Sequence, residues 1–207
     1  MLNDLIKRYP VLEDCKADIE KAKDALIECY KKDGKVLICG TGGSCADSDH
    51  IVGELMKGFI LKRPLPEEEK ALFNNIEGGE DIALKLQQGI RCISLVSQTG
   101  VISAFANDID PTLIYAQQVF AYAKSKDDVL IALSTSGNSL NIVNAVKAAK
   151  AKGIRTVSIT GEKESKLSKL SDVTIKLPTS VTYEVQELTL PVYHALCAAL
   201  EAALFCE

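Results

Sequence analysis

Five short runs of apolar and β-branched residues recur along the chain, each followed by a loop of small residues and a stretch with helical spacing. The runs are KVLIC at 35–39, RCISLV at 91–96, VLIALS at 129–134, RTVSIT at 155–160 and VTIKLP at 173–178. They are continuously apolar rather than alternating, which is typical of strands buried on both faces of a parallel sheet. Strands that alternate with helices then predict an α/β fold, a doubly wound sandwich with a five-stranded parallel sheet.

The remaining periodic stretches predict the helices that cover this sheet. A helical pattern starts at Pro10 and continues to Gly34, which gives an N-terminal helical extension over 1–33. The chain of 207 residues fits one domain, 1–207. Right-handed crossovers place the loops after the strands at one edge of the sheet. The other expected helices cover 44–60, 112–124, 138–152 and 164–170, with a long C-terminal helix over 181–205.

One inserted segment, residues 62–90, interrupts the alternation between the first helix and the second strand. It reads KRPLPEEEKALFNNIEGGEDIALKLQQGI and contains two Pro, paired Gly and many charges. Two interpretations remain open. The segment is either a surface excursion with short helices of its own, or a lid over the edge of the sheet where a ligand binds.

Charge and cysteine usage exclude several classes of partner. A net charge of -4 lacks the basic stripe that nucleic-acid binding requires. Seven scattered cysteines without CxxC spacing are typical of a reducing compartment. The longest apolar runs are shorter than the roughly 18 residues that span a bilayer, and acids interrupt the N-terminal stretch. We therefore expect a cytoplasmic protein with no nucleic-acid and no membrane partner.

A loop rich in hydroxyls, STSGNS at 134–139, ends the third predicted strand and opens a helix. Its hydroxyls and backbone N–H groups converge on a helix N-terminus, where the helix macrodipole favours an anion. The alternative is that Ser and Asn only cap the helix. Four hydroxyls in six residues exceed what one cap requires, so this serine loop is predicted to hold a phosphate.

A glycine loop, GTGGS at 40–44, follows the first strand. It lacks the Lys of a P-loop and the spacing of a dinucleotide motif, so we expect no nucleotide cofactor. Gly42 and Gly43 would let the backbone approach a ligand closely. The reactive groups of such a site are then expected in the helix that follows.

That helix carries His50 and Glu54, whose spacing of four places both side chains on one face. Such a pair can bind a metal or act as a base with its orienting partner, although a pair of this kind alone is more often structural. The only other histidine, His194, lies on the last helix, eight residues after Gln186. Both histidines thus lie beside acid or amide side chains.

Together these motifs resemble the sugar isomerase (SIS) domain family, and within it the phosphoheptose isomerases, which act on sedoheptulose 7-phosphate. The resemblance rests on GTGGS followed by HxxxEL, the pair Asn107-Asp108, STSGNS, and a QE pair with His eight residues after the Gln. It extends from about residue 35 to the C-terminus. Thr41 stands where the motif of this branch has Asn.

The resemblance implies roles for these residues. Glu54 would be the base that moves a proton between C1 and C2, and His194 the partner acid at the sugar oxygens. In several members a zinc ion is bound by the residues matching His50, Glu54, Gln186 and His194, so zinc is the implied cofactor. The implied substrate contacts are Thr41, Gly42, Gly43, Ser44, Asn107, Asp108 and Gln186 for the sugar, and Ser134, Thr135, Ser136 and Ser139 for the phosphate.

The spacing of Gln186 and His194 adds a hypothesis about assembly. Eight residues correspond to about 12 Å along a helix axis, whereas a zinc–nitrogen bond is about 2 Å long. We therefore predict that the complete site is shared between chains, in a homotetramer as the family implies, with sites at subunit interfaces.

The predicted activity is that of an aldose–ketose isomerase working through an enediol on sedoheptulose 7-phosphate or a related phosphoketose. This chemistry needs a carboxylate over the carbon and an acid or cation at the oxygens. The alternative is a non-catalytic SIS-domain regulator that binds a phosphosugar or a protein. The presence of both histidines and Glu54 favours the enzyme, because a binding module needs no proton-transfer pair.

Overall fold

The sheet of the computed structural model, which describes residues 1–206, contains five parallel strands in the order β2-β1-β3-β4-β5. All five predicted strands are present. The second is shorter than predicted, because residues 95–97 turn into a 3-10 helix, η3. The strands are β1 (Val36–Gly40), β2 (Cys92–Ser94), β3 (Val129–Leu133), β4 (Arg155–Gly161) and β5 (Val173–Leu177).

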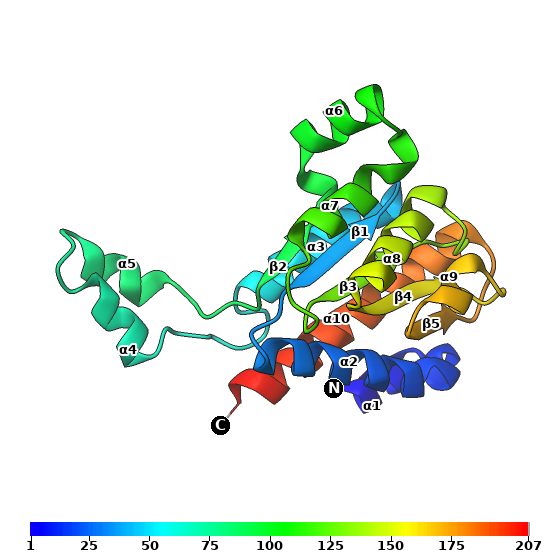
Figure 1. Ribbon diagram of the computed structural model, residues 1–207. Helices are drawn as coiled ribbons and strands as arrows, with labels where there is room; N and C mark the ends of the chain where they lie inside the picture. The colour runs from blue at the N-terminus through cyan, green and yellow to red at the C-terminus, as the bar shows by residue number, and fades with distance from the viewer. Residues whose placement is uncertain (207) are drawn as a thin grey trace.

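Helices cover both faces of this sheet (Figure 1). Alternate strand residues point to different cores: Val36 and Ile38 belong to one, Leu37 and Cys39 to the other. The predicted doubly wound sandwich is therefore confirmed. On the first face lie α1 (Leu2–Arg8), α2 (Lys16–Lys31), α3 (Gly43–Met56) and α10 (Thr182–Phe205); on the second lie α7 (Ile114–Tyr122), α8 (Leu140–Lys152) and α9 (Lys166–Leu170).

Two helical regions differ from the sequence prediction. The helix expected from Pro10 is preceded by α1 and begins as a 3-10 helix, η1 (Pro10–Cys15), because Tyr9 has non-helical dihedrals and Pro10 has no N–H. A further helix, α6 (Thr99–Asp108), was not predicted. None of its residues is fully buried, and its apolar side chains Val101, Ile102 and Phe105 are only half-buried. It is followed by a short 3-10 helix, η4 (Pro111–Leu113), that leads into α7.

The inserted segment forms an arm, residues 64–87, that projects from the body (Figure 1). It contains α4 (Glu67–Lys70), η2 (Ala71–Phe73) and α5 (Gly79–Lys85). Pro64 pairs with Gln87 in an antiparallel bridge at its base. The arm leaves the body after the C-terminal end of α3, whereas the glycine loop lies at the N-terminal end. Within one chain it is thus an excursion with its own helices, and it does not cover the glycine loop.

A buried ion pair anchors the base of the arm to α10. Arg63 and Glu201 are each 1% exposed, and Arg63 Nε lies 2.8 Å from Glu201 Oε1. Glu201 also accepts the backbone N–H groups of Phe59, Ile60 and Leu61. Burial alone would raise the pKa of Glu201, but these donors and Arg63 lower it below its ordinary value. The charge is therefore fully paired, and the direction in which the arm leaves the body is set by α10.

α10 is the one helix among residues 1–206 that is long and apolar enough to cross a membrane by length and composition. It nevertheless packs against α2 and α3, and 61% of its most apolar 18-residue window is buried inside the structure. Its composition is that of a core helix that covers one face of the sheet.

Candidate active site

The strand order places a reversal of direction at the centre of the sheet. β1 and β3 are neighbours, and the chain leaves β1 toward α3 on one face and β3 toward α8 on the other. Ligands of open α/β sheets bind outside the carboxyl ends of the strands at such a reversal. Both loops singled out in the sequence lie there, since the glycine loop follows β1 and the serine loop follows β3.

Side chains of α8 and α7 hold the glycine loop. Asn141 in the first turn of α8 donates from Nδ2 to Thr41 Oγ1 at 2.9 Å. Tyr115 of α7 donates its hydroxyl to Gly40 O at 3.0 Å. A Cβ at Gly40 would lie 2.1 Å from Ser44 O, so the tight turn after β1 requires glycine there. Thr41 is thus tied to α8, and Asn141 and Tyr115 are site residues that sequence reasoning missed.

The serine loop has the form expected of an anion cradle rather than of a simple cap. Ser134 Oγ and Ser139 Oγ lie 3.0 Å apart. Ser139 occupies the N-cap of α8 without making a side-chain cap bond, so its hydroxyl does not occupy the helix N-terminus. Gly137 has a φ of +63°, and a Cβ there would lie 2.1 Å from Ser165 Oγ. These features favour the phosphate interpretation over the capping alternative.

α3 and α10 run side by side and bring three predicted side chains together. His50 Nε2 lies 3.2 Å from Glu54 Oε1 and 3.5 Å from His194 Nε2. Glu54 Oε2 also lies 3.2 Å from Lys57 Nζ. Burial and the neighbouring His50 lower the pKa of His194 below its ordinary value, which keeps its imidazole neutral. The cluster therefore combines a carboxylate with two imidazoles where α3 and α10 meet.

The zinc ion that the family resemblance implies would need these side chains as ligands. Ligand atoms about 2.0–2.1 Å from a tetrahedral zinc lie about 3.3–3.4 Å from each other. The two distances from His50 Nε2 are close to that value. However, no group of three or more His, Cys, Asp or Glu side chains in residues 1–206 is arranged by itself to hold a metal. The fit thus rests on the two pairs that share His50.

Gln186, the fourth predicted ligand, lies at the glycine loop. A Cβ at Gly43 would come within 2.5 Å of Gln186 Nε2, so the carboxamide packs on the Gly43 backbone. Across residues 1–206 no hydrogen bond joins Gln186 to His50, Glu54 or His194. The structure thus places it with the predicted sugar contacts Thr41, Gly42 and Ser44.

Asn107 and Asp108 end α6 and are both exposed. Asn107 Nδ2 donates to Asp108 Oδ1 at 2.8 Å. In the part of the chain that the structure describes, neither forms a hydrogen bond with the glycine loop or the serine loop. A single chain therefore does not bring this pair to the other predicted contacts.

A further polar contact at the sheet edge escaped prediction. Asp49 of α3 accepts hydrogen bonds from the hydroxyls of Ser94 and Ser97, at the end of β2. The signal in the sequence was the pair of serines that ends the second strand. This contact fixes the exposed face of α3 against the neighbouring strand.

Comparison with family models and with known proteins identifies the family of this chain. A model of the SIS domain matches residues 100–204, and a second SIS domain model matches residues 3–94. The chain belongs to the SIS domain family. A phosphoheptose isomerase of Laribacter hongkongensis is 30% identical to this SIS chain over 206 residues, which cover 98% of the chain and 92% of the relative. The phosphoheptose isomerase of Helicobacter pylori is 34% identical over 190 residues, which cover 92% of the chain and 86% of the relative.

Solved structures agree with these relatives. A phosphoheptose isomerase from Francisella tularensis superposes with a TM-score of 0.73 and 26% identity, covering 89% of the SIS chain and 85% of that structure. One from Neisseria gonorrhoeae has a TM-score of 0.68 and 26% identity, covering 96% and 98%. The comparisons confirm the predicted SIS fold and place the chain among the isomerases of the family.

Proposed function

We propose that the chain is an aldose–ketose isomerase of carbohydrate metabolism that acts on sedoheptulose 7-phosphate or a related phosphoketose. The observation that carries this proposal is the convergence of Glu54, His50 and His194 between α10 and α3, the helix that follows the glycine loop. The names of the relatives support the seven-carbon substrate. A regulator that only binds its ligand would not need this cluster.

The serine loop would hold the substrate phosphate through Ser134, Thr135, Ser136, Ser139 and the N–H groups at the start of α8. That end of the helix favours negative charge and needs no Lys. The glycine loop and Gln186 would bind the sugar hydroxyls. With the phosphate fixed at one end, C1 and C2 are directed toward α3.

Glu54 would then remove a proton from one of these carbons and return it to the other. Its side chain is 15% exposed, and His50 and Lys57 hold the carboxylate in place. His194 would exchange the proton between the two oxygens, and its neutral imidazole suits this task. The proton removed from carbon is returned to the adjacent carbon, so the reaction needs no redox cofactor and no nucleotide.

We extend the proposal to a zinc ion held where chains meet, by His50, Glu54 and His194 together with Gln186, because one chain alone does not bring Gln186 to the other three. When bound, zinc would act as a Lewis acid for the developing enediolate oxygen. We also propose a homotetramer, in which a partner chain completes each site, because Asn107 and Asp108 remain apart from the loops within one chain. Seven free cysteines support a cytoplasmic location.

Replacement of the proposed base tests the function. In Glu54→Gln, turnover of sedoheptulose 7-phosphate should fall by about 10²–10⁴-fold, since a general base contributes about that factor. Deuterium uptake from D2O into the sugar should fall in parallel, while the thermal unfolding curve stays in place. The matched control is Glu20→Gln, on the outer side of α2. Unchanged turnover in Glu54→Gln would reject this residue as the base.

A further inference from the structure

The arm carries the net negative charge of the chain. Its residues, 64–87, contain six acids and two lysines, a net charge of -4 that equals the charge of the whole chain. The remaining residues are therefore neutral overall. Among residues 1–206, the one ion pair of the arm joins Lys70 to Glu67 within it. In the same part of the chain, five acids of the arm have no cationic partner, namely Glu68, Glu69, Glu77, Glu80 and Asp81.

Apolar side chains of the arm lie beside these acids. Leu72 and Leu84 are both more than half exposed. Each follows an acid by four residues, Glu68 and Glu80 respectively, which places leucine and carboxylate on the same side of a helical segment. Ile82 is 48% exposed as well. Exposed apolar side chains with charged neighbours are typical of a surface that binds another protein.

A surface of opposite charge covers the second face of the sheet. Phe120 is 58% exposed and Leu140 49%, and Lys152 Nζ lies 4.9 Å from the centre of the Phe120 ring. Lys150 pairs with Asp172, which lies outside the helices. We call the outer side of α7, α8 and α9 the basic face, because these helices contain five lysines and no acid: Lys147, Lys150, Lys152, Lys166 and Lys169.

The arm cannot reach the basic face of its own chain. Its base is fixed by Arg63 to α10, which lies on the first face of the sheet. From there the arm extends away from α8 and α9 (Figure 1). Within residues 1–206, no hydrogen bond or ion pair joins the arm to α7, α8 or α9. A second copy of the chain, however, presents the same basic face to it.

We propose that the arm of one copy docks on the basic face of a second copy, whose own arm docks on the first in return. A two-fold pair of this kind makes the same contact twice. The arm is long enough for such a contact, since each side of a standard interface contributes roughly 20–30 residues. Opposite charges at its rim select this partner surface. The inference goes beyond the proposed function and does not depend on the activity.

Charge reversal at exposed positions tests the contact. The arm variant combines Glu69→Lys with Glu80→Lys, and the face variant combines Lys147→Glu with Lys169→Glu. Either variant alone sets like charges against each other, so the dissociation constant from sedimentation velocity should rise at least about tenfold. A mixture of the two variants should assemble again, because each arm then meets a face of opposite charge. Only a contact between two chains gives this rescue.

A matched control changes the same number of charges elsewhere. Glu13→Lys combined with Glu20→Lys, on η1 and α2, should leave the dissociation constant unchanged. Leu72→Gln examines the apolar part of the contact. This side chain is exposed within one chain, so the substitution weakens assembly only if a second copy covers it. Below the dissociation constant the arm is free, and the contact then adds nothing to the stability of the body.

The outcomes are decided without substrate, so they are separate from those of the proposed activity. A wild-type protein that stays monomeric at every concentration would overturn the docking. So would arm and face variants whose dissociation constants lie within twofold of wild type, in which case the arm faces solvent or a different protein. Absence of rescue on mixing would overturn it too. If assembly responds as expected but no phosphoketose is isomerised, the docking stands and the proposed activity fails.

Discussion

The two ends of α3 carry structures of opposite kinds. At its N-terminal end, the glycine loop contacts α8, α7 and α10 through side-chain hydrogen bonds and close packing. At its C-terminal end, the arm leaves the body and is held mainly at its base (Figure 1). Chemistry is concentrated where several elements converge. The short helices of the arm have few neighbours, so many of their side chains stay exposed.

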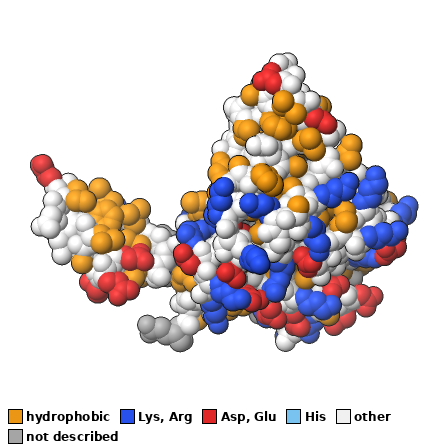
Figure 2. All heavy atoms as spheres, viewed as in Figure 1, with side chains coloured by type: hydrophobic (Ala, Val, Ile, Leu, Met, Phe, Trp, Pro, Cys, Tyr) orange, Lys and Arg blue, Asp and Glu red, His pale blue; other side chains and the backbone are white. Residues whose placement is uncertain are grey.

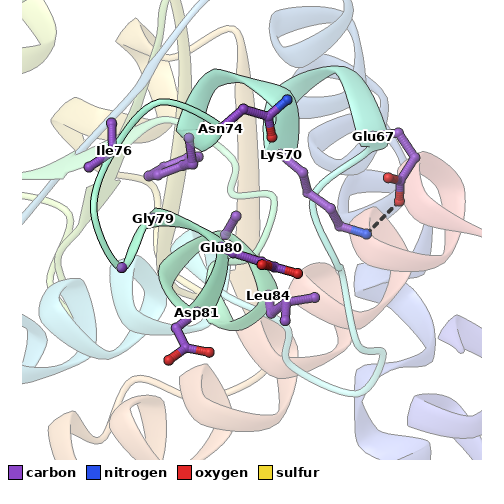
Figure 3. Close-up of a pocket in the computed structure, with 11 residues that line it drawn as sticks. Glu67, Lys70, Asn74, Ile76, Gly79, Glu80, Asp81 and Leu84 are labelled. Atoms are coloured by element: carbon purple, nitrogen blue, oxygen red, sulfur yellow. Dashed lines mark hydrogen bonds and ion pairs between the residues drawn. The ribbon is translucent and has the colours of Figure 1, made fainter.

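The arm exposes much of its apolar surface. Leu72 is 75% exposed, Leu84 64% and Ile76 54%. Figure 2 shows hydrophobic side chains on the arm beside a group of acidic ones. Figure 3 shows a hollow between its helices, where Lys70 reaches Glu67 at 2.7 Å. Helices of four and seven residues cannot enclose a core, so local pairs and the fixed base hold the arm.

Loss of the arm's anchor should have the largest effect. Arg63→Met leaves Glu201 as a buried, unpaired charge, and breaking such a pair costs about 3–5 kcal/mol. The free energy of unfolding from urea denaturation measures the change. Arg91→Met, which breaks the exposed pair with Asp33, is the control and should leave stability unchanged. If Arg63→Met changes the free energy of unfolding only slightly, the ion pair between Arg63 and Glu201 contributes little to stability.

Two glycines with positive φ allow a direct comparison, since Gly137 lies in the serine loop and Gly78 in the arm. Gly137 has a φ of +63° and a Cβ there would lie 2.1 Å from Ser165 Oγ, whereas Gly78 in the arm has a φ of +70° and nothing within 4 Å. Gly78→Ala should cost about 1–2 kcal/mol, from backbone strain alone. Gly137→Ala adds overpacking of about 1–3 kcal/mol and should raise KM for the phosphosugar. Equal costs in the two variants would contradict this difference.

Acid stability should depend on the body rather than on the arm. Burial alone would raise the pKa of Asp128, but the Lys35 ammonium and N–H, with the N–H groups of Ser125 and Lys124, lower it below its ordinary value. Because the folded pKa is depressed, this stabilisation is complete above the unfolded pKa of about 4 and is lost as pH falls. Asp128→Asn should therefore flatten the acid limb of the stability–pH curve.

The comparison for that experiment is Glu68→Gln, since Glu68 is an exposed carboxylate of the arm. Thermal unfolding measured between pH 3 and 7 should show the wild-type dependence in this variant. A flattened acid limb in Glu68→Gln as well would locate the titrating groups elsewhere.

Shortening the arm should have the smallest effect on stability. Pro64 and Gln87 already lie side by side, so an Asn-Gly turn can replace residues 66–86. Since α4 and η2 contain no buried residue and α5 buries only the small Gly79 and Ala83, the free energy of unfolding of the body should change by less than about 1 kcal/mol. A much lower melting temperature would show that residues of the arm beyond its base also stabilise the body.

The sequence predicted most of the body for a physical reason. The sequences of buried strands and helices show the periodicity of their burial. The predicted ends of β1, β3, β4 and β5 therefore lie within a residue or two of the observed ends. α6 has only ten residues and none of them is fully buried, and it was not predicted. The same limit applies to the site: His50, Glu54 and His194 follow from motif and spacing, whereas Asn141 and Tyr115 act through contacts between elements far apart in the chain. Asn107 and Asp108 contact each other rather than the two loops within one chain, and no periodic pattern in the sequence predicts that placement.

α10 makes the site a part of the cooperative core. This helix contacts the glycine loop at Gln186, carries His194, and ends its buried stretch at Glu201 beneath the arm. A segment that belongs both to the site and to the main core cannot open separately from it. Native-state hydrogen exchange at the amides around His194 should therefore proceed only through global unfolding, and the reactive cluster should persist for as long as the fold itself.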